Sequence, residues 1–222
     1  MKQRGAISLV FDDGYKEIIS DVLPLLQKYN VKATIAVPVN TESVAHSSGA
    51  TIAPLNDWKD ICAKNGHELA AHGVNHVPLP SLSDENLNEE LKTSHEGTLS
   101  DTLIYPGGAF DERVKKAAAQ YFSSARTTIW GMESLQPDDS YALKTINATK
   151  NNFAIWKWNT MALWAAIENK WLIETYHRVN NGTDDLHNVH LAKLETHLKF
   201  INLLPVKIGT IQEIQKLNEK KL

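Results

Sequence analysis

Apolar runs rich in β-forming residues alternate regularly with helical segments along this chain. Residues 5–11 form a short apolar run, and residues 18–29 then carry apolar side chains at spacings of three and four. The first pattern is typical of a buried strand and the second of an amphipathic helix. Another strand is predicted over residues 32–37, so the chain opens with a β-α-β unit.

The same alternation continues to the end of the chain. Further strands are predicted near residues 67–71, 102–105, 123–127, 171–176 and 206–209, and helices near 55–65, 84–97, 110–120, 188–203 and from 211 onward. A tryptophan-rich apolar stretch covers residues 153–168. About seven β-α steps favour an α/β fold, either a parallel barrel or a doubly wound sheet. With 222 residues the chain can bury one sizeable core, and we predict a single domain over residues 1–222.

Composition and charge argue against several classes of protein. Hydrophobic residues make up 42% of the chain and charged residues 22%, as in ordinary soluble globular proteins. A formal net charge of -3 without a basic stripe makes nucleic acid an unexpected partner. No apolar run has the length of a membrane span, and residues 1–6 are too short for a signal peptide. The single cysteine, Cys62, is expected to be a small buried hydrophobe, and the oligomeric state stays open.

Unusual polar residues follow the predicted strands at the point where each strand ends. They are Asp12 and Asp13 after the first strand, His72 and His76 after the third, Tyr105-Pro106-Gly107 after the fourth, Arg126 after the fifth and His177 after the strand at 171–176. In a parallel barrel the carboxyl ends of the strands lie on one face, where active sites are built. Side chains far apart in the sequence can therefore converge on a single site.

The pair His72 and His76 has the four-residue spacing that lets two imidazoles reach one metal ion. Two histidines and one carboxylate suit zinc or a similar divalent transition metal, and Asp12 or Asp13 can supply the carboxylate. Two adjacent carboxylates need a cation or a shared proton to relieve their repulsion, and the aspartate left over can act as a general base. The plainer interpretations are a chance pair among nine histidines and an ordinary Asp-Asp-Gly turn.

Three further features are weaker candidates. The small residues in Tyr105-Pro106-Gly107-Gly108 let a substrate approach the backbone, where an N–H could stabilise an oxyanion, although Pro-Gly is most often only a turn. His177 is the candidate general acid, with a core or rim histidine bonded to backbone as the alternative. Core packing is expected to explain most of the six tryptophans. The remaining histidines are predicted to lie on the surface: His46, His67, His95, His187, His190 and His197.

Together these residues resemble the polysaccharide deacetylase family, also called the NodB homology or carbohydrate esterase 4 group, over about residues 5–216. Val10-Phe11-Asp12-Asp13-Gly14 is similar to its first motif, (T/S)FDDG, and His72-Gly73-Val74-Asn75-His76 to its second, H(S/T)xxH. The resemblance implies an irregular (β/α)7 barrel in which Asp13, His72 and His76 bind the metal and Asp12 is the catalytic base. Zinc is the expected metal, with cobalt or nickel as alternatives.

The later motifs depart from the family pattern. In RxPxG, Ile104 stands where the arginine would be, while Pro106 and Gly108 keep their places and the oxyanion N–H belongs to Gly107. That arginine normally braces the catalytic aspartate, and Arg126 could substitute for it. No clear DxxDW motif is found. The LxH motif is matched best by Tyr176-His177, which leaves His177 as the general acid.

The resemblance implies removal of N-acetyl groups from a carbohydrate of the peptidoglycan, chitin-like or poly-N-acetylglucosamine type, outside the cell or in its envelope. Asp12 would take a proton from the attacking water and His177 would protonate the departing amine. One or two tryptophans near the active face could stack on a sugar ring. Two alternatives stay open: a hydrolase of the same fold that acts on a small amide or an O-acetyl ester, and a catalytically silent carbohydrate-binding protein. Retention of both the base and the acid argues against the silent protein.

Overall fold

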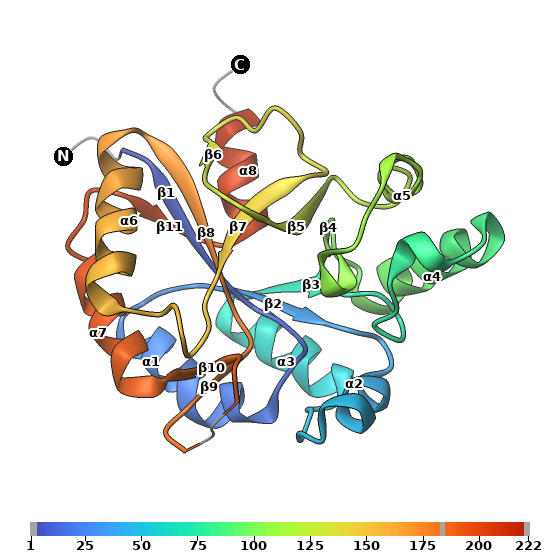
Figure 1. Ribbon diagram of the computed structural model, residues 1–222, viewed down its shortest axis with the longest axis horizontal. Helices are drawn as coiled ribbons and strands as arrows, with labels where there is room; N and C mark the ends of the chain where they lie inside the picture. Colours follow the sequence, from blue (N-terminus) through green and yellow to red (C-terminus); the bar gives the residue numbers. More distant parts are fainter. Residues whose placement is uncertain (1–3, 183–184, 220–222) are drawn as a thin grey trace.

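The computed structural model describes residues 4–182 and 185–219. Its centre is a closed barrel of seven parallel strands, which hydrogen-bond in this order: β1 (Ala6–Phe11), β2 (Thr34–Val37), β3 (Glu68–Ala71), β4 (Thr102–Ile104), β5 (Ser124–Trp130), β7 (Leu143–Asn147) and β8 (Lys170–Tyr176). The last strand, β8, closes the barrel by pairing with all six residues of β1 (Figure 1). The described residues therefore form a single-domain (β/α)7 barrel, and the doubly wound sheet is excluded.

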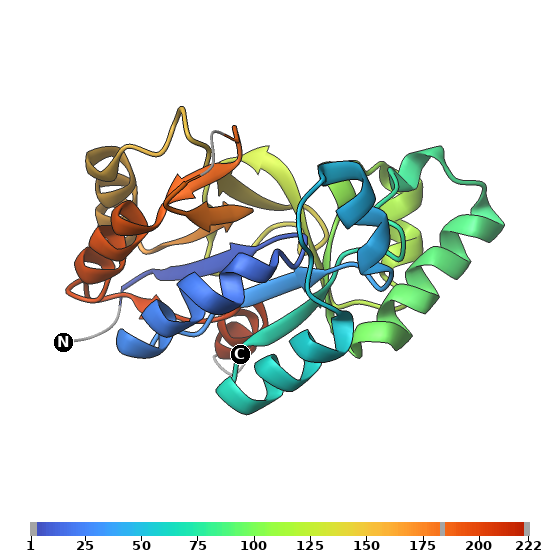
Figure 2. The same ribbon diagram turned by 90° about the horizontal axis from the view of Figure 1, so that it is seen from below.

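Helices surround this barrel, as Figures 1 and 2 show from two directions. They are α1 (Leu23–Lys28), which follows a π-helical turn at Ile18–Val22, α2 (Thr41–Ser48), α3 (Leu55–Asn65), α4 (Asp84–Thr98), α5 (Glu112–Ala118), α6 (Ile155–Ile167) and α7 (Leu191–Ile201). The last helix, α8 (Ile211–Glu219), covers the amino end of the barrel instead. Its Ile211 and Ile214 pack on interior side chains, and the Ile211 N–H donates to Thr34 Oγ1 at 3.0 Å.

Alternate residues of each strand point into the barrel and out toward the helices. Val10 and Ala36 belong to the interior apolar cluster, whereas their neighbours Leu9 and Ile35 pack outward in the main core. This is the period of two that a strand imposes. Apolar side chains fill the interior, and α8 covers the amino end. A functional site can therefore lie only at the carboxyl end of the barrel.

The prediction of seven barrel strands is confirmed, but one of the seven predicted strands is not part of the barrel. The strand expected at 206–209 is β11 (Lys207–Ile208), which pairs only with Ala6 and Ile7 at the start of β1. The seventh barrel strand is β7, which was not predicted. Half-buried residues such as Lys144 interrupt its apolar pattern, so the sequence lacks a clear strand signal there.

Several short elements also differ from the prediction. Helix α2, the antiparallel strand β6 (Glu133–Ser134) and the paired strands β9 (Arg178–Asn180) and β10 (Asn188–His190) were not predicted. The helix expected from residue 188 begins at Leu191, because β10 occupies the preceding residues. The tryptophan-rich stretch is α6.

Burial corrects two expectations about side chains. His197 was expected on the surface but is fully buried, with Nε2 3.1 Å from Glu174 Oε1. Core packing explains only half of the tryptophans: Trp58, Trp158 and Trp171 are buried, while Trp130, Trp156 and Trp164 are exposed. Cys62 is buried as expected. Within the described ranges, no helix combines the length and the apolar character needed to cross a membrane.

Candidate metal centre and active site

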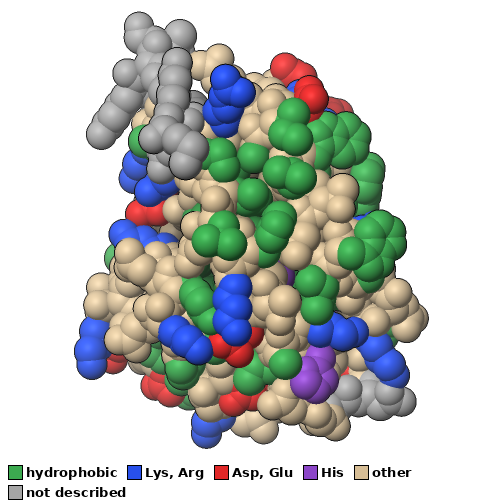
Figure 3. Space-filling model, turned by 90° about the vertical axis from the view of Figure 1, so that its left-hand side faces the viewer, with side chains coloured by type: hydrophobic (Ala, Val, Ile, Leu, Met, Phe, Trp, Pro, Cys, Tyr) green, Lys and Arg blue, Asp and Glu red, His purple; other side chains and the backbone are tan. Residues whose placement is uncertain are grey.

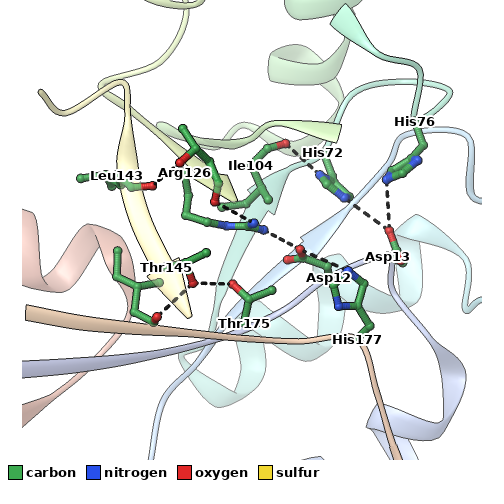
Figure 4. Close-up of polar contacts among 12 residues, drawn as sticks. Asp12, Asp13, His72, His76, Ile104, Arg126, Leu143, Thr145, Thr175 and His177 are labelled. Atoms are coloured by element: carbon green, nitrogen blue, oxygen red, sulfur yellow. Dashed lines mark hydrogen bonds and ion pairs between the residues drawn. The ribbon is translucent and has the colours of Figure 1, made fainter. Parts of the chain in front are cut away.

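Strand β1 delivers two adjacent aspartates to the carboxyl rim of the barrel. Asp12 and Asp13 are 3% and 7% exposed, and the chain turns sharply at Asp13, whose φ is 72°. A positive φ is unusual for a residue with a side chain and often marks a functional site. The turn sends the two carboxylates in different directions, Asp12 toward Arg126 and Asp13 toward His72 and His76 (Figure 4). The two aspartates therefore face different partners.

The two histidines of the HxxxH sequence approach one oxygen of Asp13. Nε2 of His72 lies 3.3 Å from Asp13 Oδ1, and Nε2 of His76 lies 3.4 Å from the same atom. Nδ1 of His72 donates a hydrogen bond to the Ile104 carbonyl oxygen at 2.8 Å. This bond assigns the proton to Nδ1 and leaves the Nε2 lone pair directed toward Asp13.

The loop that carries these histidines is held by its neighbours. Glu90 of α4 accepts hydrogen bonds from the backbone N–H groups of Val74 at 2.7 Å and Asn75 at 3.2 Å. His76 has a φ of 54°, a second strained residue at the rim. A Cβ on Gly73 would lie 3.0 Å from Pro106 Cγ, so the loop packs tightly against the segment after β4. These contacts fix where the imidazoles point.

Asp13, His72 and His76 form a donor set that fits a metal ion. Their ligand atoms all lie within 4.8 Å of one another. Asp13 Oδ1 is buried and accepts no hydrogen bond of normal geometry within the described residues, which is costly unless a cation neutralises it. Burial acts to raise the pKa of Asp13, but interaction with His72 and the charges of His177 and His76 outweigh it and hold the pKa well below its usual range. An ionised carboxylate beside two imidazoles suits zinc.

Asp12 faces Arg126 of β5, and this pair is buried. Arg126 is 1% exposed, and its Nη2 donates to Asp12 Oδ2 at 2.5 Å. Ile104 and Arg126 are direct partners in the register of β4 and β5, so both side chains enter the barrel at the same level. Arg126 on β5 therefore reaches Asp12 from a position next to Ile104 on β4. The other oxygen, Asp12 Oδ1, has no hydrogen-bond partner within the described ranges.

His177 follows β8 and lies on the other side of Asp12. Its Nε2 is 3.9 Å from Asp12 Oδ2, and its buried Nδ1 has no hydrogen-bond partner among the described residues. Burial lowers the pKa of His177, and the charges of His187 and Arg126 act in the same direction, against the opposing charges of Asp12 and Asp13. The His187 ring lies 5.0 Å from that of His177. Sequence reasoning missed this neighbour, because nothing in the pattern around His187 signals it.

The segment Tyr105-Pro106-Gly107 reaches the rim through Pro106 and Gly107 and not through the Tyr105 side chain. The Tyr105 side chain packs on the outside of the barrel, where its hydroxyl donates to the Tyr141 carbonyl at 3.1 Å and its ring stacks on Phe110. Gly107 has a φ of 61°, and a Cβ there would meet no atom within 4 Å. The space beside Gly107 is therefore open to a ligand, whereas the Tyr105 ring is turned away.

The chain is similar to known proteins over about half of its length. Residues 2–122 match the family model described as polysaccharide deacetylase. The Bacillus subtilis protein YxkH, named as a polysaccharide deacetylase, is 30% identical over 121 residues, which are 50% of this chain and 40% of YxkH. The peptidoglycan-N-acetylglucosamine deacetylase of Bacillus cereus is 27% identical over 130 residues, which are 56% of this chain and 55% of that protein. The matches thus span about half the length of these relatives or less.

A solved structure agrees over the full chain. A Mycobacterium smegmatis protein described as a polysaccharide deacetylase superposes with a TM-score of 0.68 at 15% identity, covering 100% of this chain and 93% of that one. At this identity the likeness supports the fold alone. The family match covers more than half of the chain, including the aspartates and both histidines of the donor set. The chain therefore belongs to the polysaccharide deacetylase family.

Proposed function

We propose that this protein is a metal-dependent hydrolase that removes N-acetyl groups from an N-acetylated carbohydrate. The observation that carries the proposal is the grouping of side chains at one barrel rim. Asp13, His72 and His76 direct three donor atoms at one point, and Asp12 and His177 flank that point. A bound divalent ion supplies a Lewis acid that polarises the acetyl carbonyl and makes water more acidic.

In this proposal Asp12 is the general base. Its Oδ2 is held by Arg126, which fixes the direction of the carboxylate, while Oδ1 is free to accept a proton from the attacking water. The water oxygen then bonds to the acetyl carbon. The open space at Gly107 lets its backbone N–H approach the carbonyl oxygen that gains negative charge.

His177 is the general acid. The C–N bond breaks as the imidazolium donates its proton to the amine nitrogen, and the products are acetate and a free amino sugar. Because burial lowers the pKa of His177, its protonated form is a stronger acid than an ordinary imidazolium. The 3.9 Å between His177 Nε2 and Asp12 Oδ2 supports this pairing of roles, because an acid and a base so close together can act on one reacting group.

The proposed substrate is a polymer or oligomer of the peptidoglycan, chitin-like or poly-N-acetylglucosamine type. Trp130 supports a sugar substrate, because it is 68% exposed at the end of β5, four residues beyond Arg126, where its ring can stack on a sugar. The name of the Bacillus cereus relative supports peptidoglycan within this class. Such polymers lie outside the cell or in its envelope, which is the proposed site of action.

Acetate release tests the proposal. The purified chain is incubated with chitin oligomers, peptidoglycan fragments, poly-N-acetylglucosamine, simple acetamides and O-acetyl esters, with and without chelator and with zinc added back. We expect acetate from at least one N-acetylated sugar, its loss with chelator and its return with zinc. Release only from acetamides or esters would reject the sugar substrate. If no compound releases acetate, the proposal that the protein is a hydrolase is wrong.

A further inference from the structure

Helix α6 carries an apolar face that the rest of the described chain leaves uncovered. Trp156 is 74% exposed, Leu163 42%, Trp164 58% and Ile167 63%. Together with Thr160, these residues recur at spacings that place them on one side of the helix. Figure 3 looks onto the side of the molecule where α6 lies in Figure 1, and apolar side chains gather there. A continuous stripe of this kind marks an interaction surface, whereas scattered apolar residues need no explanation.

We propose that two copies of the chain associate through this stripe, with their α6 helices antiparallel across a two-fold axis. The stripe is complementary to itself in that orientation. When the axis passes between Met161 and Ala162, Trp156 meets Ile167 of the second copy, and Thr160 meets Leu163 of the second copy. Each of these two levels joins a larger side chain to a smaller one, and Trp164 lies level with Asn159 of the second copy.

The polar groups in and beside the stripe suit the same arrangement. Thr160 Oγ1 donates to the Trp156 carbonyl oxygen at 2.7 Å, so its hydroxyl can enter an apolar interface already hydrogen-bonded. Lys157 and Glu168 each follow a stripe residue by one position and lie along the same edge. Antiparallel pairing about this axis brings Lys157 of each copy within two residues, about 3 Å along the helix, of the level of Glu168 of the other, whereas parallel pairing would set Lys157 level with Lys157.

The stripe has about the area of the smallest specific interfaces. Two tryptophans and two aliphatic side chains at these exposures present on the order of 500 Å² of surface per copy. Two copies would bury about 1,000 Å² before the flanking residues contribute, which reaches the lower range of specific interfaces. Helix α6 begins near the carboxyl rim and ends near the amino end of the barrel. The antiparallel pair therefore directs the two rims oppositely and leaves both open.

Sedimentation velocity of the full chain at several concentrations tests the proposal. The wild type is expected at the dimer mass. Leu163→Glu and Ile167→Lys should each weaken the dimer by at least roughly 30-fold, because each places an unpaired charge in an apolar interface. Leu203→Glu is the matched control, because Leu203 is 82% exposed outside the stripe and should not affect the mass. Circular dichroism and acetate release should stay unchanged in all three variants.

A charge swap tests the antiparallel orientation. Lys157→Glu and Glu168→Lys should each weaken the dimer, and the double variant should restore it, because each pair is then reversed rather than broken. A wild type that stays monomeric at every concentration would overturn the proposal. The same holds if this monomer binds phosphatidylglycerol vesicles through α6, because the stripe would then face a membrane. A dimer that Leu163→Glu and Ile167→Lys leave intact would also overturn it. These readouts do not depend on the proposed deacetylation.

Discussion

The buried pair of Asp12 and Arg126 depends on the register of two strands. Ile104 and Arg126 are opposite each other on β4 and β5, so either position can direct a long side chain toward Asp12. Removing one member of a buried ion pair leaves the other charged and desolvated, which costs about 3–5 kcal/mol. At the residue scale, Arg126 therefore supports both the stability of the barrel and the direction of the proposed base.

Moving the arginine between strands tests this role. Arg126→Ile should lower the rate of acetate release by roughly 100-fold or more and the free energy of unfolding by about 3 kcal/mol, because Asp12 loses its partner. The double variant Ile104→Arg with Arg126→Ile should recover part of both, measured by acetate assay and urea denaturation. A double variant no better than the single one would show that register alone does not explain the pair.

His67 predicts a pH dependence of stability. Its Nδ1 accepts a hydrogen bond from the Ala33 N–H at 3.1 Å, and burial, aided by the charge of Lys32, lowers its pKa from 6.5. The contribution of His67 to the free energy of unfolding is therefore complete above about pH 6.5. This contribution is lost as the pH falls below that value toward the folded-state pKa. The melting temperature of the wild type should fall more between pH 7.5 and 5.5 than that of His67→Gln, whose amide oxygen does not titrate. Parallel pH profiles would contradict this assignment.

Part of the site could be predicted residue by residue. Asp12, Asp13, His72, His76 and His177 were found because each follows a recognisable strand, and strand ends of a parallel barrel share one face. His187 and the buried pair of His197 and Glu174 were not, since their contacts join segments with no pattern in common. The outward turn of the Tyr105 ring also depends on which face of β4 meets the core.

At the scale of elements, prediction succeeded where an apolar run ended in polar residues. Strands β1, β3 and β8 have that form, whereas β7 mixes buried and half-buried residues and was missed. Helix α6 was read only as an apolar stretch. Both of its faces are apolar and each carries tryptophan, so the sequence cannot show which face meets the barrel.

The segment after β4 gives an element-scale prediction. Gly108 has a φ of 71°, and a Cβ there would lie 2.3 Å from Thr128 Oγ1. Gly49 has a similar φ of 64° with nothing within 4 Å, so it is a matched control. Gly49→Ala should lower the free energy of unfolding by about 1 kcal/mol, and Gly108→Ala by about 2–4 kcal/mol with reduced acetate release. Equal losses in urea denaturation would show that the Thr128 contact does not matter.

At the scale of the whole molecule, barrel closure creates the site. The pairing of β1 with β8 brings Asp12 and His177 together, and α8 covers the opposite end. The strand pattern alone did not distinguish a barrel from a doubly wound sheet, because the sequence of a single segment does not determine which strands pair. The family resemblance selected the barrel, and the structure agrees.

The most direct test asks whether Asp12 serves catalysis alone while Asp13, His72 and His76 also bind the metal. Zinc content, by mass spectrometry, and acetate release from the best substrate are measured on the same preparations of wild type, Asp12→Asn and His76→Ala. Asp12→Asn should keep about one zinc per chain and lose activity by at least roughly 100-fold, whereas His76→Ala should lose both. An active Asp12→Asn variant, or a His76→Ala variant that keeps its zinc and its activity, would contradict the account.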